Sequence, residues 1–515
     1  MHLYPTSLVL LYAVTTSLGA WTPLRSLVRR DNSTFLDCLE RAGLDAVVEG
    51  ATTYANDSKP FNLRFNYKPA AIVYPNNSTE VSAAVRCGAQ NGVKVNARSG
   101  GHSYAAFALG GEDGHLTVSL DNLRHLSVNG STNTATIGAG NRLGDVALYL
   151  WDNGKRAMAH GTCPFVGIGG HAGQGGFGLP SRAWGLFADQ VTSIEIVTAD
   201  GAILNASTTE NADLFWAAMG AGSNFGIITK FTTVTHNALD SVAFAYTFIN
   251  YTAEEASNGL LAWQKFANDS ENPLDANLGL QLHIDPDSDA PSGISFSVSG
   301  SYYDADEAKL NATMATLLAD LGTPDKTMTQ TQHWIASVLY LAGIQNGSHA
   351  LNTTIAPDER DHFYATSTFV SEQEPVGKPS TDALMQYFYG PGTNTTVGWF
   401  IIFDLYGGAK SAIKNVGADF NSFDARDALY SIQYYGSYSN STISDADAIT
   451  FIQGMKAALE GNQPNTTFKE YANYIDSTYS AEVAHQKYYP THTERLTKLK
   501  DQYDPDRVFH NPQDF

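Results

Sequence analysis

RSGGHSY, residues 98–104, and HGTCPFVGIGGH, residues 160–171, are the two stretches on which the interpretation of this chain depends. Both are rich in glycine, and each carries one nucleophilic side chain, His102 in the first and Cys163 in the second. Glycine lets the main chain approach a ligand closely, and successive backbone N–H groups form nests that bind anions. The two loops therefore predict a site for a phosphate-bearing cofactor, with one point of covalent attachment on each loop.

Bulk composition narrows the class of protein. The chain has 515 residues, long enough for two or three domains that each have a hydrophobic core. It is 43% hydrophobic and 16% charged, which is typical of a globular protein. The formal net charge of −21 argues against nucleic acid and against an anionic membrane surface, because both need a basic protein surface. We expect neither as a partner.

Residues 1–20 resemble a secretory signal peptide. An apolar run at residues 7–14 is followed by small residues and a plausible cleavage site after Gly19 or Ala20, although no Lys or Arg precedes the run. The alternative is a short buried N-terminal segment. Asn-X-Ser/Thr sequons recur along the chain, for example at Asn129, Asn250 and Asn394, and no later run is apolar and long enough to span a bilayer. We therefore predict a secreted, extracellular glycoprotein.

The cysteine count is odd. Cys38 and Cys87 lie in helix-like stretches near the N-terminus and form the natural disulfide pair. Cys163 is left over among glycines, next to Pro164. It is either a buried, inert thiol or a functional one.

The N-terminal half reads as alternating strands and helices. The sequence predicts a strand at 70–75, then a helix that Asn77 caps with Glu80 three residues later and that Gly92 ends. A strand over 93–98 then runs into the first glycine loop. Further strands are predicted at 116–120, 134–140 and 192–201, with a helix at 145–153 and a glycine turn leading into a strand at 220–231.

After about residue 235 the pattern changes to longer alternating strands, at 241–251, 276–285, 293–303 and 397–408. Helical stretches at 383–388 and 446–461 lie among them, and the C-terminal residues 503–515 are loop-like. Such a mixture predicts an antiparallel sheet with helices on one face, and an α+β fold overall.

Two other types of site are disfavoured. The GxGxxG-like spacings in GIGGHAGQGGFG, residues 167–178, have no apolar helical pattern behind them, so a Rossmann dinucleotide fold is not expected. The spacings of His102, His160, Cys163 and His171 match no zinc pattern, and we predict no metal.

The motifs resemble a known family. Residues 69–231 are similar to the FAD-binding module of the vanillyl-alcohol-oxidase superfamily, also called PCMH-type. With YANYID (471–476) and DPDRVFHNPQ (504–513), the chain resembles its berberine-bridge-enzyme-like branch, and above all the fungal oligosaccharide oxidases. The resemblance implies a signal peptide (1–20), an FAD-binding domain (21–235, core 69–235), a substrate-binding domain (236–474) and a C-terminal segment (475–515) that returns to the FAD-binding domain. The substrate domain would contain the large antiparallel sheet.

The same resemblance implies bicovalent FAD. His102 would bond the 8α-methyl group of the isoalloxazine and Cys163 its C6 atom. Cofactor-binding positions carried over from the family are Arg98, Ser99, Gly100, Gly101, Ser103, Gly167, Gly169, Gly170, His171, Gly175, Gly176 and Val197.

Substrate residues also follow from the resemblance. Tyr474 matches the base that takes the hydroxyl proton, and Asp404 matches its partner, while Tyr104, Thr162 and Gln433 match sugar-binding positions. Ile402 departs from the polar residue that the family pattern predicts there. Phe400, Ile402 and Asp404 would share one strand face, and the alternative for Asp404 is a strand end in water.

Three functions remain open on the sequence. The first is an oxidase that converts the anomeric C1 hydroxyl of an oligosaccharide to the lactone, which opens to the aldonic acid, with O₂ reduced to H₂O₂. The second is a same-fold FAD-linked oxidase of a secondary metabolite or another alcohol, including oxidative cyclisation. The third is a non-catalytic secreted glycoprotein, which the presence of both nucleophiles disfavours. We expect a monomer.

Overall fold

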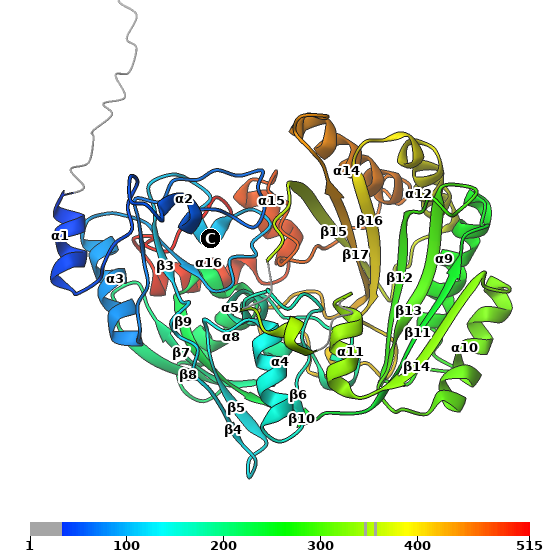
Figure 1. Ribbon diagram of the computed structural model, residues 1–515, viewed down its shortest axis with the longest axis horizontal. Helices are drawn as coiled ribbons and strands as arrows, with labels where there is room; N and C mark the ends of the chain where they lie inside the picture. Colours follow the sequence, from blue (N-terminus) through cyan, green and yellow to red (C-terminus); the bar gives the residue numbers. More distant parts are fainter. Residues whose placement is uncertain (1–32, 344–347, 355–357) are drawn as a thin grey trace, which may run out of the picture.

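A computed structural model of the chain describes residues 33–343, 348–354 and 358–515. The proposed signal peptide, residues 1–20, lies outside the described residues. The chain folds into two halves, each built on its own sheets and core, as Figure 1 shows. Helices and antiparallel sheet are mixed in both halves, which confirms the predicted α+β class.

The first half contains two sheets. A parallel three-stranded sheet has the order β1-β3-β2, and an antiparallel five-stranded sheet has the order β4-β5-β9-β7-β8. A two-stranded ribbon, β6-β10, adds to them. The strands are β1 (Ala71–Val73), β2 (Val95–Arg98), β3 (Leu116–Ser119), β4 (Leu126–Asn129), β5 (Thr134–Gly138), β6 (Arg156–Ala157), β7 (Val191–Val197), β8 (Ile203–Ser207), β9 (Ile227–Val234) and β10 (His236–Asn237).

Helix α3 (Ser78–Gln90) connects the first two parallel strands, and its ends follow the predicted signals. The Asn77 side chain accepts a hydrogen bond from the Glu80 N–H and donates one to the Glu80 carboxylate. Gly92 follows the helix with φ +63°, a left-handed conformation that glycine adopts without strain. The disulfide between Cys38 and Cys87 ties helix α1 (Ser33–Arg41) to α3, as predicted.

The second half is dominated by a seven-stranded antiparallel sheet with the order β14-β11-β13-β12-β16-β17-β15. Four long helices pack on one face of it, where their apolar sides meet the sheet in a single core. The strands are β11 (Ser241–Phe248), β12 (Leu278–Pro286), β13 (Ile294–Tyr302), β14 (Lys326–Gln332), β15 (Phe363–Ser371), β16 (Gly398–Leu405) and β17 (Ala428–Ser437). The helices are α9 (Ala253–Ala267), α10 (Glu307–Leu321), α12 (Lys378–Tyr389) and α14 (Asp445–Glu460).

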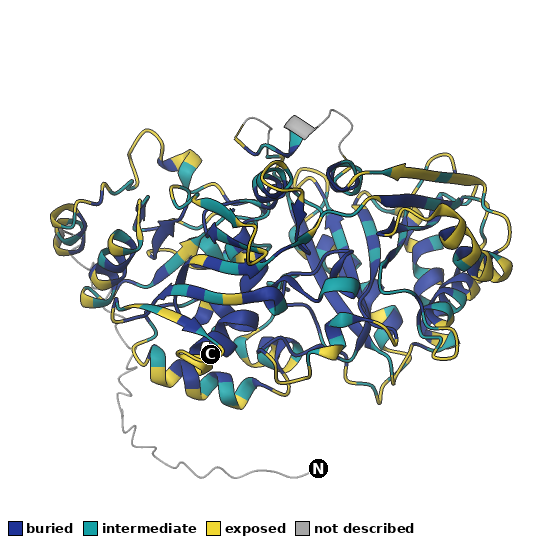
Figure 2. Cartoon of the chain, turned by 90° about the horizontal axis from the view of Figure 1, so that it is seen from below, coloured by how far each residue is buried: buried dark blue, intermediate teal, exposed yellow. Residues whose placement is uncertain are grey.

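Figure 2 shows that buried residues run through both halves and that the outer faces of the helices are exposed. Shorter helices complete the fold. They are α2 (Tyr54–Asp57), α4 (Leu143–Asp152), α5 (Ile168–Gly173), α6 (Ser181–Trp184), α7 (Phe187–Gln190), α8 (Ala212–Ala221), α11 (Trp334–Leu341) and α13 (Ala412–Asn415). Within the described residues no helix is long and apolar enough to cross a membrane.

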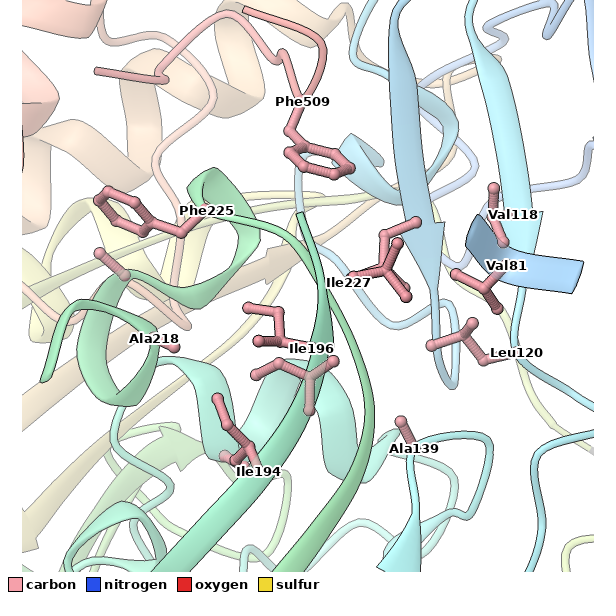
Figure 3. Packing of buried hydrophobic residues seen from close by; sticks show 14 of the residues in the cluster. Val81, Val118, Leu120, Ala139, Ile194, Ile196, Ala218, Phe225, Ile227 and Phe509 are labelled. Carbon is pink, nitrogen blue, oxygen red and sulfur yellow. The ribbon is translucent and has the colours of Figure 1, made fainter. Parts of the chain in front are cut away.

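The C-terminal segment crosses back onto the first half. Helices α15 (Ala481–Tyr488) and α16 (Thr493–Tyr503) pack there, and the last residues run beside β2, where the Val95 N–H donates to the Val508 carbonyl. Phe509 enters the same core as Ile227 and Val118 (Figure 3). Only 2% of Phe509 is exposed, and burying such a ring contributes roughly 1.5–3 kcal/mol.

Two features differ from the sequence interpretation. Residues 168–173, for which no helical pattern was found, form the short helix α5. Seven strands were not predicted: the short strands β4, β6, β8 and β10, and β14, β15 and β17 of the large sheet. Strand β14 is polar and exposed, whereas β15 and β17 are buried on both faces and lack the alternation of a strand with one solvent-exposed face.

Candidate active site

The two glycine loops lie against each other, backbone to backbone. A Cβ atom added to Gly100 would overlap the backbone of Gly167, and one added to Gly167 would overlap Gly100. The Ser99 hydroxyl fixes this contact, since it donates to the Ala139 carbonyl at 2.6 Å and accepts from the Gly169 N–H at 3.1 Å. Only glycine allows such an approach, which explains the glycines at these positions.

A cavity of about 330 Å³ opens along both loops. It brings together residues that lie as far apart in the chain as Val95 and Asn511, including both nucleophiles and the predicted base. The predicted residues that line it are Ser99, Gly100, Gly101, His102, Ser103, Tyr104, Thr162, Cys163, Gly167, Gly169, Gly170, His171, Gln433 and Tyr474.

Five predicted residues do not line this cavity, as far as the described chain shows. Arg98 turns away and donates to Ser119 Oγ at 3.1 Å. Gly175 faces the ring of Phe423, Gly176 lies beside His171 and donates its N–H to the hydroxyl of a tyrosine that does line the cavity, and Val197 is fully buried in β7. Asp404 does not line the cavity, but its negative charge raises the pKa of Tyr474, which does.

The cavity suits FAD by the polar groups that it presents. Gln174 Oε1 and His171 Nε2 are buried at its wall without a hydrogen-bond partner, and a buried polar atom of this kind calls for a ligand or water. Burial lowers the pKa of His171 to about 3, so this imidazole is neutral at ordinary pH. A Cβ on Gly170 would meet nothing within 4 Å, which leaves its backbone open to a ligand.

His102 and Cys163 present both nucleophiles to the same cavity. The imidazole of His102 stacks on Phe61, with ring centroids 3.9 Å apart, and its Nε2 lies 3.1 Å from Asp358 Oδ1. Cys163 is unpaired and partly buried, and burial raises the pKa of its thiol. The backbone N–H groups of Phe165 and Val166 act in the opposite direction, because they stabilise the thiolate.

Asp404 supplies the buried charge of the site. Only 4% of it is exposed, and its carboxylate accepts a hydrogen bond of 2.6 Å from Gln281 Nε2. Burial raises its pKa to about 6, and the Gln281 hydrogen bond partly offsets this effect. Its negative charge is one cause, after burial, of the high pKa of Tyr474.

Tyr474 is held by two other tyrosines. Its ring is parallel to that of Tyr104 at 5.9 Å and meets the edge of Tyr471 at 5.0 Å. The Tyr471 hydroxyl accepts from the Gly176 and Phe177 N–H groups, each at 3.2 Å, and it also accepts from Asn473 Nδ2 at 3.0 Å. Tyr474 is thereby oriented by a neighbour that is itself fixed to the backbone.

The predicted sugar-binding residue Gln433 lies on the face of the seven-stranded sheet opposite the helices. Along β16, Ile401, Phe403 and Leu405 face the helices, and the alternate residues Phe400, Ile402 and Asp404 face the other way, as predicted. Ile402 is opposite Gln433 and His283 on the neighbouring strands. Gln433 Nε2 donates to the Tyr104 hydroxyl at 2.9 Å.

Sequence reasoning missed four residues of the site. Gln281 lies opposite Asp404 and could have been found from the strand alternation, and Tyr471 lies three positions before Tyr474 in YANYID. Phe61 and Asp358 had no signal, because both belong to irregular segments far from His102 in the sequence. No group of three metal-ligating side chains occurs in the described part of the chain.

Comparisons with known proteins agree with this geometry. The FAD binding domain family matches residues 69–207, and the berberine and berberine like family matches residues 470–514. A chitooligosaccharide oxidase of Gibberella zeae is 33% identical over 92% of this chain and 93% of its own length. A xylooligosaccharide oxidase of Thermothelomyces thermophilus is 34% identical over 100% of this chain and 99% of its own.

A solved structure of the glucooligosaccharide oxidase from Acremonium strictum, described as carrying 6-S-cysteinyl, 8α-N1-histidyl FAD, superposes with a TM-score of 0.85. It is 32% identical and the match covers 93% of this chain and 98% of that one. Fold, cavity and relatives together define an FAD-binding oxidoreductase. More narrowly, the chain belongs to the berberine-bridge-enzyme-like family, in which its relatives include fungal oligosaccharide oxidases.

Proposed function

We propose that this protein is a secreted flavoprotein oxidase that oxidises the anomeric C1 hydroxyl of oligosaccharides to the lactone and reduces O₂ to H₂O₂. One observation carries the proposal. Tyr474, with the buried carboxylate of Asp404 acting on it, reaches the same cavity as His102 and Cys163, although more than 300 residues separate Tyr474 from Cys163. A base for a hydroxyl proton thus lies beside a predicted flavin site.

The two nucleophiles would hold FAD covalently, His102 through the 8α carbon and Cys163 through C6. The related enzyme with a cysteinyl and histidyl flavin supports this assignment. When bound, FAD supplies the hydride acceptor for the carbon that bears the reacting hydroxyl. Two bonds fix the cofactor from the protein side and leave the substrate side open.

Tyr474 takes the proton from the C1 hydroxyl while Asp404 assists it. A free phenol is a weak base at neutral pH, because its pKa is near 10. As Tyr474 accepts the substrate proton, it can release its own toward Asp404, whose carboxylate is more basic than usual with a pKa of about 6. Asp404 is buried and Tyr474 is partly buried, which limits exchange of this proton with bulk water.

Gln433 and Tyr104 would hold the sugar. Their mutual hydrogen bond fixes an amide and a phenol at the cavity wall, where both can exchange hydrogen bonds with hydroxyl groups. Ile402 adds an apolar surface beside them, which favours a sugar that turns a C–H face rather than a hydroxyl toward β16. This arrangement supports an oligosaccharide as substrate but leaves its identity to a direct assay.

Replacing Tyr474 with Phe tests the base. We expect anaerobic reduction of the flavin by sugar to slow by about 10²–10⁴-fold, the usual contribution of a positioned base. The purified variant should stay yellow. Tyr389→Phe is the matched control, because it removes a partly buried phenol of helix α12 that does not line the cavity. Near-normal reduction in the Tyr474 variant would remove it as the base.

A substrate panel separates the remaining functions. We expect peroxide release with cello-, xylo-, malto- or chito-oligosaccharides or lactose. Release only with simple or aromatic alcohols would favour the secondary-metabolite or alcohol oxidase. A colourless protein would instead support a non-catalytic glycoprotein.

The predicted signal peptide and two features of the described chain support the proposed secretion. The disulfide between Cys38 and Cys87 is typical of an oxidising compartment, and the sequon residues Asn129, Asn250 and Asn394 are exposed. Expression of the full chain in a fungal host should release a glycosylated protein into the medium. Retention of the unprocessed chain inside the cells would contradict this.

A further inference from the structure

His102 stands in the wall between two cavities. Its imidazole lines the large cavity of the active site, whereas Asp358 and Phe61 line a smaller polar cavity of about 150 Å³. Ser99, Gly100 and Gly101 border both spaces, so the first glycine loop separates them. The ring of His102 is therefore approached from behind by groups that do not reach the active site.

The rear contacts fix the imidazole in one orientation. Phe61 covers one ring face at a centroid distance of 3.9 Å and a 21° angle between the planes. Asp358 Oδ1 lies 3.1 Å from Nε2. Within the described chain His102 is the only hydrogen-bond partner of Asp358, so no other group competes for this carboxylate through a hydrogen bond.

This contact decides which nitrogen is free. A carboxylate accepts but does not donate, so Nε2 must carry the proton. Nδ1 then keeps its lone pair. The His102 side chain is only 8% exposed and that of Asp358 is 18% exposed, so water competes weakly for the Nε2 proton.

We propose that Asp358 is a positioning residue for attachment of FAD to His102. The inference rests on the proposed covalent attachment and deepens it. Asp358 holds the proton on Nε2, directs Nδ1 at the cofactor and balances the positive charge that the imidazole gains as Nδ1 forms its new bond. A buried aspartate acts on histidine in the same way in hydrolytic triads, where it orients the ring and stabilises the imidazolium.

The attachment balances as follows. The Nδ1 lone pair forms a bond to the 8α carbon, one C–H bond of that methyl group breaks, and its proton leaves. The electron pair passes to the isoalloxazine, which is left reduced by two electrons, and dioxygen takes that pair and two protons to give H₂O₂. The imidazolium finally loses its Nε2 proton, for which Asp358 is the nearest acceptor. Cys163 takes no part in this step.

The inference separates the two attachments. Asp358 touches His102 through a hydrogen bond, and no hydrogen bond joins it to Cys163 in the described structure. Replacing Asp358 with Ala should therefore slow formation of the histidyl bond by at least about tenfold, the lower end of what a carboxylate partner of a functional histidine contributes. The charge of Asp358 is also one cause of the raised pKa of the Cys163 thiol, so its removal favours the thiolate. The cysteinyl bond should therefore form at least as readily as in the wild type.

The test uses the full-length holoprotein. Wild type, Asp358→Ala, Asp358→Asn and Glu359→Ala are incubated in air after purification and digested, and mass spectrometry follows the FAD-bearing peptides. Wild type should give the His102 and Cys163 peptides joined through one FAD. Asp358→Ala should give FAD mainly on the Cys163 peptide, with the His102 linkage appearing at least about tenfold more slowly. Glu359→Ala should match wild type, because it removes the same charge from the neighbouring, exposed position.

Chemical rescue distinguishes positioning from a general loss of structure. Formate is a small carboxylate that fits the cavity left in Asp358→Ala, and adding it should restore the histidyl bond in that variant but not in Asp358→Asn. Wild-type rates in Asp358→Ala, equal loss of both attachments, or failure of formate to restore the bond would each overturn the role of Asp358. A wild-type protein without FAD on His102 would instead overturn the proposed bicovalent attachment.

Discussion

Replacing Asp404 with Asn should stabilise the protein and at the same time disable it. The carboxylate is 4% exposed, and its one hydrogen bond in the described structure comes from Gln281 Nε2 at 2.6 Å. Asparagine has nearly the same shape, and its carbonyl oxygen can still accept from Gln281. The substitution therefore removes the buried charge without opening a cavity.

The magnitude follows from the pKa. Burial raises the pKa of Asp404 from its ordinary 3.8 to about 6. A raised carboxyl pKa means that the folded state binds the proton more tightly than the unfolded state, so stability is lost as pH rises from about 4 through about 6. At about 1.36 kcal/mol per pH unit, the loss is about 3 kcal/mol above pH 7. The Asn variant does not lose this stability, and its Tm should therefore be higher by roughly 3–6 °C.

Thermal unfolding at two pH values measures this effect. At about pH 8 the Asn variant should melt above the wild type, and near pH 3 the two should agree, because Asp404 is then mostly protonated in both the folded and the unfolded state. Asp240→Asn is the matched control, since it removes an exposed carboxylate and should change Tm little at either pH. Two results would refute the free-energy cost attributed to the buried charge of Asp404. One is an Asn variant with a lower Tm than the wild type at pH 8, and the other is a Tm difference between the two proteins that is the same at both pH values.

The same variant tests the proton path. In the wild type, anaerobic flavin reduction by sugar should fall as pH drops below about 6, because a protonated Asp404 cannot accept the proton from Tyr474. In Asp404→Asn the rate should be lower by about 100-fold or more and should lose this acid limb. An unchanged pH profile would separate Asp404 from the reaction.

Three further changes test the frame around the site. Gly100→Ala places a Cβ inside the backbone of the second loop, and we expect at least a tenfold lower flavin absorbance per protein; normal flavin content would contradict the close contact. Replacing Cys38 and Cys87 with Ser removes a disulfide between residues 49 positions apart, and denaturant titration should show a free energy of unfolding lower by about 4 kcal/mol. A decrease of less than about 1 kcal/mol would contradict a stabilising role for the disulfide. Lys500→Met leaves the carboxylate of Asp504 buried without its partner, and a loss of about 3–5 kcal/mol should be partly recovered by adding Asp504→Asn.

The sequence predicts local structure correctly where a residue type favours one particular backbone conformation or hydrogen bond. Asn77 caps a helix because its side chain reaches the Glu80 N–H three residues on, and Gly92 ends that helix because it adopts a positive φ. The alternation of Phe400, Ile402 and Asp404 was visible for the same reason, because one face of β16 meets helices and the other does not. Strand β15 escaped detection because both of its faces are buried.

The candidate site divides in the same way. The glycines in contact across the two loops could be predicted from the sequence, because a close backbone contact requires glycine and makes both segments rich in it. Gly175 and Gly176 belong to the same run in the sequence but serve packing and the Tyr471 hydroxyl. Composition alone could not distinguish glycines that line the cavity from glycines that pack against side chains, because the distinction depends on which atoms surround each glycine in the fold.

The residues that sequence patterns could not supply are those that act through another residue. Asp358 acts on His102 across 256 positions, and Gln281 acts on Asp404 across 123. Strand alternation places Gln281 on the same face of the sheet as Asp404, but only the pairing of β12 with β16 makes them partners. The contact between Asp358 and His102 has no local signal, because the fold brings together two segments that are distant in the sequence. The nucleophiles and the base can therefore be recognised from motifs, while the groups that set their protonation come from the tertiary fold. Variation at Asp358 and Gln281 should accordingly change attachment and pH dependence before it changes which cofactor is bound.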